Sequence, residues 1–412
     1  MNTKIFGLAL AAIAACGIAH AAAQDAASAD SRLELRQFLE DAARNHPRLE
    51  GARAELDAVE ARGRARSRPL YNPEFEGEFS DSEDDDNDSR SIGLSKAFDI
   101  TNKRATRAKG ARSAVESATL SYEVEKRALF ADVLTALADY QAGKRLLDLS
   151  TQRTEVAREF ASIAARRAEA GDLSKSEHLA AQLSRSQAVA EQTTASSEFS
   201  EARQALTALI GEAKPSWPEL PEPPAAAPPL DMTLVRRLPE VRAAEANADA
   251  LAAEIRFAKK ARIPDPTIGA AYGREGEADF SGVRLSVPIP VFASGQAEVD
   301  EARAERVAAE QSIRNQLRNA EARLLETSGR YAVAAHSWSA WMRDGSDVLG
   351  EQRRVLDQLW RSGDITAVEY LVQLDQTYSA ERAGIELKGS VWRAWIDWLD
   401  ASGTLNEWME TL

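Results

Sequence analysis

Glutamates alternate with aromatic residues in one short segment of this 412-residue chain. Glu74, Glu76 and Glu78 occupy every second position, and Phe75 and Phe79 fall on the alternate positions. Because a β-strand has a period of two residues, the pattern predicts a strand with carboxylates on one face and rings on the other. Lining a pore, such carboxylates favour cations over anions; on a water-soluble sheet they form an ordinary solvated face.

An acidic run follows this segment directly. Residues 81–88 contain six acids in eight positions. An EF-hand loop counted from Asp84 would need a glycine and a bidentate acid where Ser89 and Ser95 stand, so a dedicated calcium site is excluded. The run is typical of a solvated, cation-attracting loop, with weak bridging of lipopolysaccharide or metal-ion binding as the alternative.

Acids also recur at two turn-like motifs. The glycines of these motifs are suited to end one helix, and the hydroxyl residues are suited to cap the next. An acid in a first helical turn can simply complement the helix dipole, so the motifs alone do not establish a binding role. They are Gly171-Asp172-Leu173-Ser174 followed by Glu177, and Gly363-Asp364-Ile365-Thr366 followed by Glu369.

Enzymatic chemistry finds no support in the sequence. Its four histidines are dispersed, it has one cysteine, and it lacks the His-Glu-x-x-His, Gly-x-Ser-x-Gly and phosphate-binding glycine motifs. We therefore expect no enzyme, no cofactor and no resident metal site. The net charge of −14 argues against a protein that holds nucleic acid.

The motifs belong to a tandem duplication. The constant offset of 192 that relates the two turns also relates Pro47 to Pro239. Between the copies, residues 214–230 form a proline-rich linker that we expect to be extended. The first repeat is predicted to span residues 24–213 and the second 231–412.

Each repeat has the same predicted order of a helix, a β-hairpin and a long helical hairpin. The β-hairpins cover about 70–98 and 266–291; the helical hairpins cover 101–211 and 295–400, and a C-terminal tail follows. The fold class is therefore mainly α with a small β part. Helices on the order of 100 Å long, at 1.5 Å per residue, do not suit a compact domain, and their adjacent apolar stripes favour a helical barrel or a coiled coil.

The N-terminus has the pattern of an export signal. Lys4 precedes an apolar stretch, and small residues follow up to Ala23, so residues 1–23 are predicted to be a signal peptide. The segment ending at Cys16 resembles a lipobox, and lipidation of Cys16 is the alternative to simple cleavage. The remaining chain has no apolar run near the roughly 20 residues of a membrane-spanning helix, so it would cross a membrane as strands.

The duplication, one β-hairpin per copy, the long helices and the two glycine turns make the chain resemble the TolC-like outer-membrane efflux proteins. More narrowly, it resembles the outer-membrane components of cobalt-zinc-cadmium resistance exporters. The resemblance implies a homotrimer in the outer membrane of a Gram-negative bacterium, with a twelve-stranded β-barrel and an α-barrel tunnel of twelve helices through the periplasm. Four strands cannot close a barrel, and open sheet edges are not tolerated in lipid, so copies from other chains would have to complete it.

The same resemblance implies roles for particular residues. It implies a periplasmic gate of acids, although Val372 stands where the family's second acid ring would fall. It also implies that the turns dock a periplasmic adaptor protein, which connects the channel to an inner-membrane resistance-nodulation-division pump. In a barrel, Glu74, Glu76 and Glu78 would be pore-lumen acids, and Arg284 would neutralise part of their ring. The gate candidates are Glu369, Glu177, Asp364 and Asp172, and the docking candidates are Gly171, Leu173, Ser174, Gly363, Ile365 and Thr366.

The resulting hypothesis is a passive exit duct of a tripartite efflux system. Heavy-metal cations are the favoured cargo, because the glutamate face and the acidic loop suit them. The alternative cargo is a drug or other organic solute, or a protein of type I secretion. A non-channel periplasmic coiled-coil scaffold is the competing class, in which the alternating segments would be water-soluble β-tips.

Overall fold

The computed structural model describes residues 31–80, 89–212, 214–292 and 294–412. The chain divides into two compact units. One consists of residues 48–125 and 236–319, and the other contains 126–235, 320–412 and the described residues up to 47. The expected signal peptide, Cys16 and the acidic run 81–88 lie outside the described residues.

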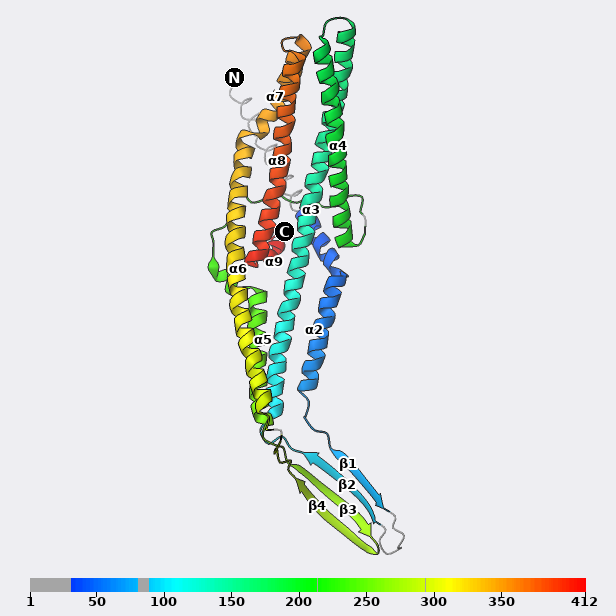
Figure 1. The fold of residues 1–412 in the computed structure, drawn as a ribbon, viewed down its shortest axis with the longest axis vertical. Coiled ribbons are helices and arrows are strands. Elements are labelled where there is room, and N and C mark those ends of the chain that lie inside the picture. Colours follow the sequence, from blue (N-terminus) through cyan, green and yellow to red (C-terminus); the bar gives the residue numbers. More distant parts are fainter. Residues whose placement is uncertain (1–30, 81–88, 213, 293) are drawn as a thin grey trace, which may run out of the picture. The chain divides into compact units, whose positions relative to one another are not determined.

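The same order of elements occurs twice along the chain (Figure 1). This order confirms a mainly α fold with a small β part, built as a tandem duplication. The first copy contains α2 (Pro47–Arg66), β1 (Glu74–Ser80), β2 (Ser89–Ala97), α3 (Lys103–Glu169) and α4 (Lys175–Ile210). The second contains η2 (Met232–Arg237), α5 (Pro239–Ala261), β3 (Thr267–Glu275), β4 (Ala278–Ser286), α6 (Gln296–Asp344), α7 (Ser346–Ser362), α8 (Ala367–Ser402) and α9 (Leu405–Glu410).

The four strands form one antiparallel sheet in the order β1-β2-β3-β4. Strand β2 of the first repeat pairs with β3 of the second, so the two hairpins are joined into a single sheet. Strand β4 ends at Ser286, short of the expected boundary at 291. Pro288 and Pro290 explain the difference, because a proline has no amide hydrogen to donate to a strand ladder.

The second helical hairpin differs from the first. Helix α3 runs unbroken for 67 residues, whereas the corresponding stretch of the second repeat is interrupted at Gly345, between α6 and α7. The Gly345 amide donates to the Trp341 carbonyl oxygen over 2.8 Å, and a Cβ at position 345 would lie 2.9 Å from that oxygen. The expectation of a continuous helix was therefore wrong here, and only glycine fits the break without displacing its neighbour.

The middle of α3 is packed on two adjacent apolar stripes, as its sequence predicts. Leu129, Val133 and Leu137 of one stripe are fully buried, and so is Leu134 of the other. The spacing of three between Trp392, Trp395 and Trp398 likewise predicts a packing stripe. All three rings are buried, and Trp395 stacks on Trp398 with ring centroids 4.9 Å apart.

The proline-rich linker is bound to the helices of its unit. Trp217 is buried, the Pro218 carbonyl accepts a hydrogen bond from Gln141 Nε2 over 2.9 Å, and the Pro224 carbonyl accepts one from the Tyr331 hydroxyl over 2.6 Å. Gln141 belongs to α3 and Tyr331 to α6, so the linker ties helices of the two repeats together.

In the other unit, a buried ion pair joins the helix-to-sheet junctions of the two repeats. Lys103 Nζ lies 2.8 Å from Asp265 Oδ2, with the two side chains 6% and 2% exposed. The Tyr71 hydroxyl donates to the same carboxylate over 2.7 Å, and Lys103 also donates to the Ile263 carbonyl. Because Lys103 begins α3 and Asp265 precedes β3, the pair fixes the sheet to its helices.

Asp265→Asn should destabilise this junction, because Lys103 keeps its charge in a buried place. We expect the free energy of unfolding to fall by about 3–5 kcal/mol, the usual cost of removing one partner of a buried pair. Adding Lys103→Met removes the stranded charge and should restore part of the loss. Thermal unfolding of the detergent-solubilised protein, followed by circular dichroism, measures both effects.

Asp300→Asn is a matched control, because the contact of Asp300 with Arg303 on α6 is exposed. It should leave the unfolding transition nearly unchanged. Equal losses for the Asp265 and Asp300 variants would contradict a special role for the buried pair.

Candidate functional site

The two glycine turns form the ends of helical hairpins. Gly171 follows α3 and Gly363 follows α7, and both have a φ of 82°. A Cβ at either position would meet nothing within 4 Å, so the left-handed backbone, rather than crowding, favours glycine. The prediction that the helices end at these glycines is confirmed.

Each turn continues into a capping box. The Ser174 hydroxyl accepts a hydrogen bond from the Glu177 amide, and the Thr366 hydroxyl accepts one from the Glu369 amide, both over 3.2 Å. In return, Glu177 Oε2 accepts from the Ser174 amide over 3.0 Å, and Glu369 Oε2 accepts from the Thr366 amide over 2.8 Å. These bonds satisfy amides that have no partner inside the helix, and they confirm both predicted N-caps.

The capping bonds lower the pKa of both glutamates. For Glu177 the main cause is the hydrogen bond from the Ser174 hydroxyl, and for Glu369 it is the bond from the Thr366 amide. Glu369 is exposed and Glu177 partly so, and both carboxyls stay ionised to a lower pH than an ordinary glutamate. Each turn therefore carries a fixed negative charge next to an exposed aspartate, Asp172 or Asp364.

The apolar residues of the turns face inward. Leu173 and Ile365 are partly buried and pack against the core cluster beneath the turns. Each directly precedes an N-cap, a position whose side chain commonly packs back onto its helix. Gly171, Ser174 and Thr366 are exposed, so the turns offer mainly polar and backbone groups to a partner.

Aromatic rings join the two hairpins near these turns. Phe160 of α3 lies 4.9 Å from Trp360 of α7 and 5.1 Å from Tyr370 of α8, measured between ring centroids. Arg167 lies over the Trp360 ring at 4.7 Å. Because the three rings come from three helices, this cluster resists separation of one hairpin from the other.

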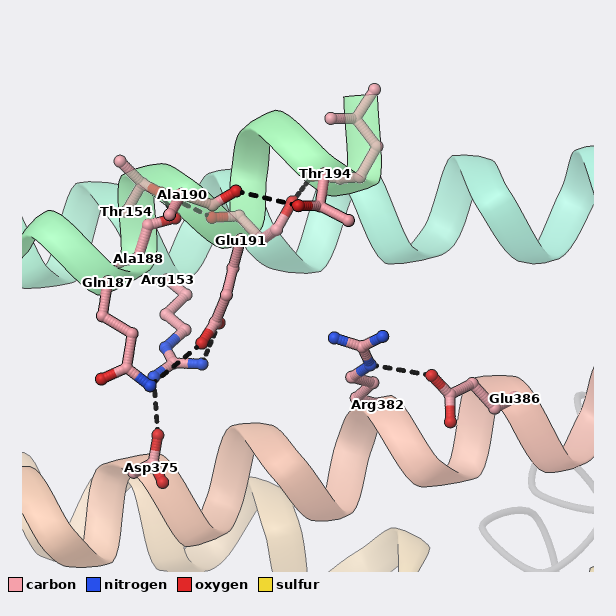
Figure 2. A network of polar contacts seen from close by, with 12 residues as sticks. Arg153, Thr154, Gln187, Ala188, Ala190, Glu191, Thr194, Asp375, Arg382 and Glu386 are labelled. Carbon is pink, nitrogen blue, oxygen red and sulfur yellow. Dashed lines mark hydrogen bonds and ion pairs between the residues drawn. The ribbon is translucent and has the colours of Figure 1, made fainter. Parts of the chain in front are cut away.

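One arginine joins the same hairpins further along α3. Figure 2 shows Arg153 pointing between α4 and α8. It contacts Glu191 of α4, and its Nη2 lies 2.6 Å from Asp375 Oδ1 of α8. The Arg153 side chain is 14% exposed and borders a cavity of about 170 Å³, which Arg382 also lines. A single shielded cation thus holds acids from two helices.

The sheet exposes its apolar face. Phe75, Phe79 and Val283 are 75%, 76% and 81% exposed, whereas Ser95 on the other face is 8% exposed. A water-soluble sheet packs its apolar face against a core and leaves its polar face in water. Here the apolar face is itself exposed.

The glutamates lie on the face opposite Phe75 and Phe79, as their spacing predicts. Ser95 Oγ donates to Glu76 Oε1 over 3.3 Å, and Arg284 Nη1 lies 3.3 Å from Glu76 Oε2. Glu76 is on β1 and Arg284 on β4, so their side chains meet across two intervening strands. The small residues of those strands, among them Gly93 and Gly269, leave room for this contact.

Two features are absent from the described residues, namely a membrane-spanning helix and a cluster of metal ligands. None of the described helices has an apolar stretch long enough to span a bilayer. In the same residues, no group of three or more histidines, cysteines, aspartates or glutamates is arranged to hold a metal ion.

The family model described as "Outer membrane efflux protein" matches the chain twice, over residues 38–212 and 231–404. The chain belongs to this efflux family. The double match repeats the duplication seen in the order of helices and strands. Like other outer-membrane efflux proteins, it is an outer-membrane protein and not an enzyme.

Individual relatives support the same assignment. The cobalt-zinc-cadmium resistance protein CzcC of Cupriavidus metallidurans is 27% identical over 273 residues, which are 64% of this chain and 64% of that protein. The match therefore spans slightly less than two thirds of the relative's length.

Solved structures share the fold of this efflux protein. CusC has a TM-score of 0.75 at 16% identity, covering 90% of this chain and 92% of its own. The outer membrane protein VceC of Vibrio cholerae has a TM-score of 0.74 at 16% identity, covering 90% and 96%. The Campylobacter jejuni CmeC outer membrane channel has a TM-score of 0.74 at 13% identity, covering 90% and 86%.

Sequence reasoning found the tips of the efflux protein but missed Arg153. The two acids that bind Arg153 are 38 and 222 residues away along the chain, and no motif marks any of the three. The gate roles of Glu369, Glu177, Asp364 and Asp172 and the docking roles of the turns stay predictions. The structure adds that both glutamates already serve as parts of a helix cap.

Substitutions at Glu369 can separate its capping role from its charge. Glutamine accepts the same amide hydrogen bond but carries no charge. Alanine neither accepts the bond nor carries a charge. We expect Glu369→Gln to keep the first turn of α8 protected from amide hydrogen exchange, and Glu369→Ala to expose it. Glu177→Gln and Glu177→Ala provide a matched pair at the other tip.

The same hydrogen-exchange measurement on the wild-type protein can be repeated at decreasing pH. Since the folded pKa is lowered, capping by the carboxylate is complete above the ordinary value of 4.5 and is lost as the pH falls through the lowered value. After correction for intrinsic exchange, the wild-type tip should then approach the behaviour of the glutamine variant, because a protonated carboxyl is uncharged but still has an oxygen that accepts the amide hydrogen bond. Equal exposure in the glutamine and alanine variants at neutral pH would contradict capping as the main structural role.

Proposed function

We propose that this efflux protein is the trimeric exit duct of a tripartite efflux system. Three copies would close a twelve-stranded barrel in the outer membrane, and their long helices would form a tunnel in the periplasm. The observation that carries the proposal is the exposed apolar face of the sheet, with glutamates and small residues on the other face. Such a sheet suits lipid outside and water inside.

The edges of the sheet support the trimer. Among the described residues, β1 and β4 each pair with one neighbouring strand only. Unpaired backbone groups are not tolerated in the hydrocarbon region, so the edges of one copy would have to pair with those of others. Three sets of four strands lie within the range of known outer-membrane barrels.

Heavy-metal cations are the cargo we favour. The face that would line the pore carries Glu74, Glu76 and Glu78, and it offsets them with Arg284. A relative at 27% identity is named for cobalt, zinc and cadmium resistance. Organic solutes and proteins of type I secretion are the alternative cargo.

The gate and the docking surface follow from the turns. An adaptor would meet the exposed polar groups around Gly171 and Gly363, while Glu177 and Glu369 would bring negative charge to the tunnel entrance. Arg153 and the Phe160 cluster would hold the two hairpins of one copy together at that end. The competing scaffold gains no support from a sheet that exposes its apolar face.

Reversal potentials in planar bilayers would test the pore face. We expect purified trimer to conduct and to select cations, and the triple change Glu74→Gln, Glu76→Gln and Glu78→Gln to lower this selectivity several-fold. Arg284→Gln should raise it, because it removes the opposing charge. Lys96→Gln, on the apolar face, serves as the control and should change neither.

Absence of current from correctly folded trimer would refute the channel and favour a scaffold. Current without any response to these substitutions would instead place the glutamates outside the conduction path.

The cargo is tested in a deletion strain. We expect loss of tolerance to zinc, cobalt and cadmium, restored by the wild-type gene and not by a chain truncated before β3. The same strains are tested in parallel for tolerance to a panel of organic toxicants. Unchanged metal tolerance with lost tolerance to organic compounds would overturn the cargo assignment and leave the channel intact.

A further inference from the structure

A row of charged residues crosses the apolar face of the sheet at one end. The strand register pairs Phe79 with Arg90, Arg90 with Arg274, and Arg274 with Asp279. Directly paired residues point to the same side of a sheet, so the two guanidinium groups are neighbours on the face that carries Phe79. Both arginines are exposed.

The rows beneath this one are apolar. Going toward the helices, the same face presents Ile92 beside Tyr272, then Leu94 beside Phe75, and each of these side chains is more than half exposed. The next charge on the face is Lys96, six residues from Arg90 along β2. That separation is about 20 Å along the strand, or about 15 Å along the membrane normal at the usual strand tilt of about 40°. The two charges therefore lie at opposite ends of the apolar rows.

The arginine row lies at the end of the sheet away from its helices. Helices α3 and α6 begin just after the ends of β2 and β4, while the turn joining β3 to β4 lies at the other end, directly beyond Arg274 and Asp279. If the helices stand in the periplasm, as the proposed function requires, the arginine row lies at the level of the outer leaflet.

The row has positive charge available for a ligand. Arg274 Nε lies 2.7 Å from Asp279 Oδ1, an exposed pair that leaves the two terminal nitrogens of the guanidinium free to donate elsewhere. Arg90 makes no ion pair with a residue that the structure describes. Within this row, two arginines against one aspartate leave a net charge of +1, while Glu275 alternates onto the other face and Glu277 lies in the turn beyond. The forked guanidinium suits phosphate oxygens.

We propose that Arg90 and Arg274 bind a phosphate group on the sugar head of an outer-leaflet glycolipid, while the apolar rows beneath them contact its acyl chains. The combination of paired guanidinium groups and an adjoining apolar face selects a phosphorylated lipid over free phosphate. The site rests on the proposed membrane-spanning sheet, but it is separate from the pore face and from the tips.

Binding of lipid A to full-length trimer in detergent tests the site. The probes are fluorescent diphosphorylated lipid A, its enzymatically dephosphorylated form, and inorganic phosphate as competitor, all in EDTA. We expect Arg90→Gln with Arg274→Gln to bind diphosphorylated lipid A about tenfold more weakly, the loss expected when a charge-assisted hydrogen-bonded contact is removed. The wild type should also bind the dephosphorylated lipid about tenfold more weakly than diphosphorylated lipid A.

Two further variants sharpen the result. Arg90→Lys with Arg274→Lys keeps the charges without the fork and should recover part of the affinity. Lys96→Gln removes a cation from the same face at the other end and should leave the affinity unchanged. Displacement of lipid A by millimolar inorganic phosphate would show a phosphate site without a lipid component and would overturn the proposal.

The remaining outcomes also test the proposed lipid site. Equal affinity of wild type and double glutamine variant overturns the site, and so does wild-type binding that EDTA abolishes, because divalent cations would then be the bridge. If the trimer conducts in bilayers but shows no preference for phosphorylated lipid, the lipid site fails alone. If it neither inserts nor conducts, the proposed function fails and the lipid site fails with it.

Discussion

The unpaired backbone edges of β1 and β4 are the constraint on which the proposed assembly depends. A four-stranded sheet with an exposed apolar face is unsuited to water, and its edges are unsuited to lipid, where each unpaired backbone group costs several kcal/mol. Contact with lipid removes the first problem, and pairing with further copies removes the second. In the proposed trimer, membrane insertion and assembly would therefore be coupled, and the Lys103–Asp265 pair would contribute by holding the strands in a fixed relation to their helices.

Much of this organisation can be predicted from local sequence patterns. The two-residue alternation around Glu76 identifies a strand, and the repeated turns at Gly171 and Gly363 identify helix ends, because both depend on residues close together in the chain. The alternation does not by itself show which face is exposed. That information comes from the packing of all four strands, two from each repeat.

Features that depend on distant residues were not predictable in this way. Arg153 carries no sequence signal that distinguishes it from the many surface arginines of α3, and its role appears only when Glu191 and Asp375 are brought to it. The break at Gly345 has no local signal either, because glycines such as Gly110 and Gly143 lie within the unbroken helix α3. The acids at the tips do not reveal a gating role by their positions, because helix capping alone would favour Glu177 and Glu369 there.

The break at Gly345 makes the two repeats unequal although they descend from one unit. In a threefold assembly, three α3–α4 hairpins and three α7–α8 hairpins would alternate around the axis, and only the second kind adjoins an interrupted helix. The ring of six tips would thus have only pseudo-sixfold symmetry. A partner ring of six identical subunits would meet two different binding surfaces in alternation. Its subunits would therefore need enough conformational flexibility to bind both surfaces.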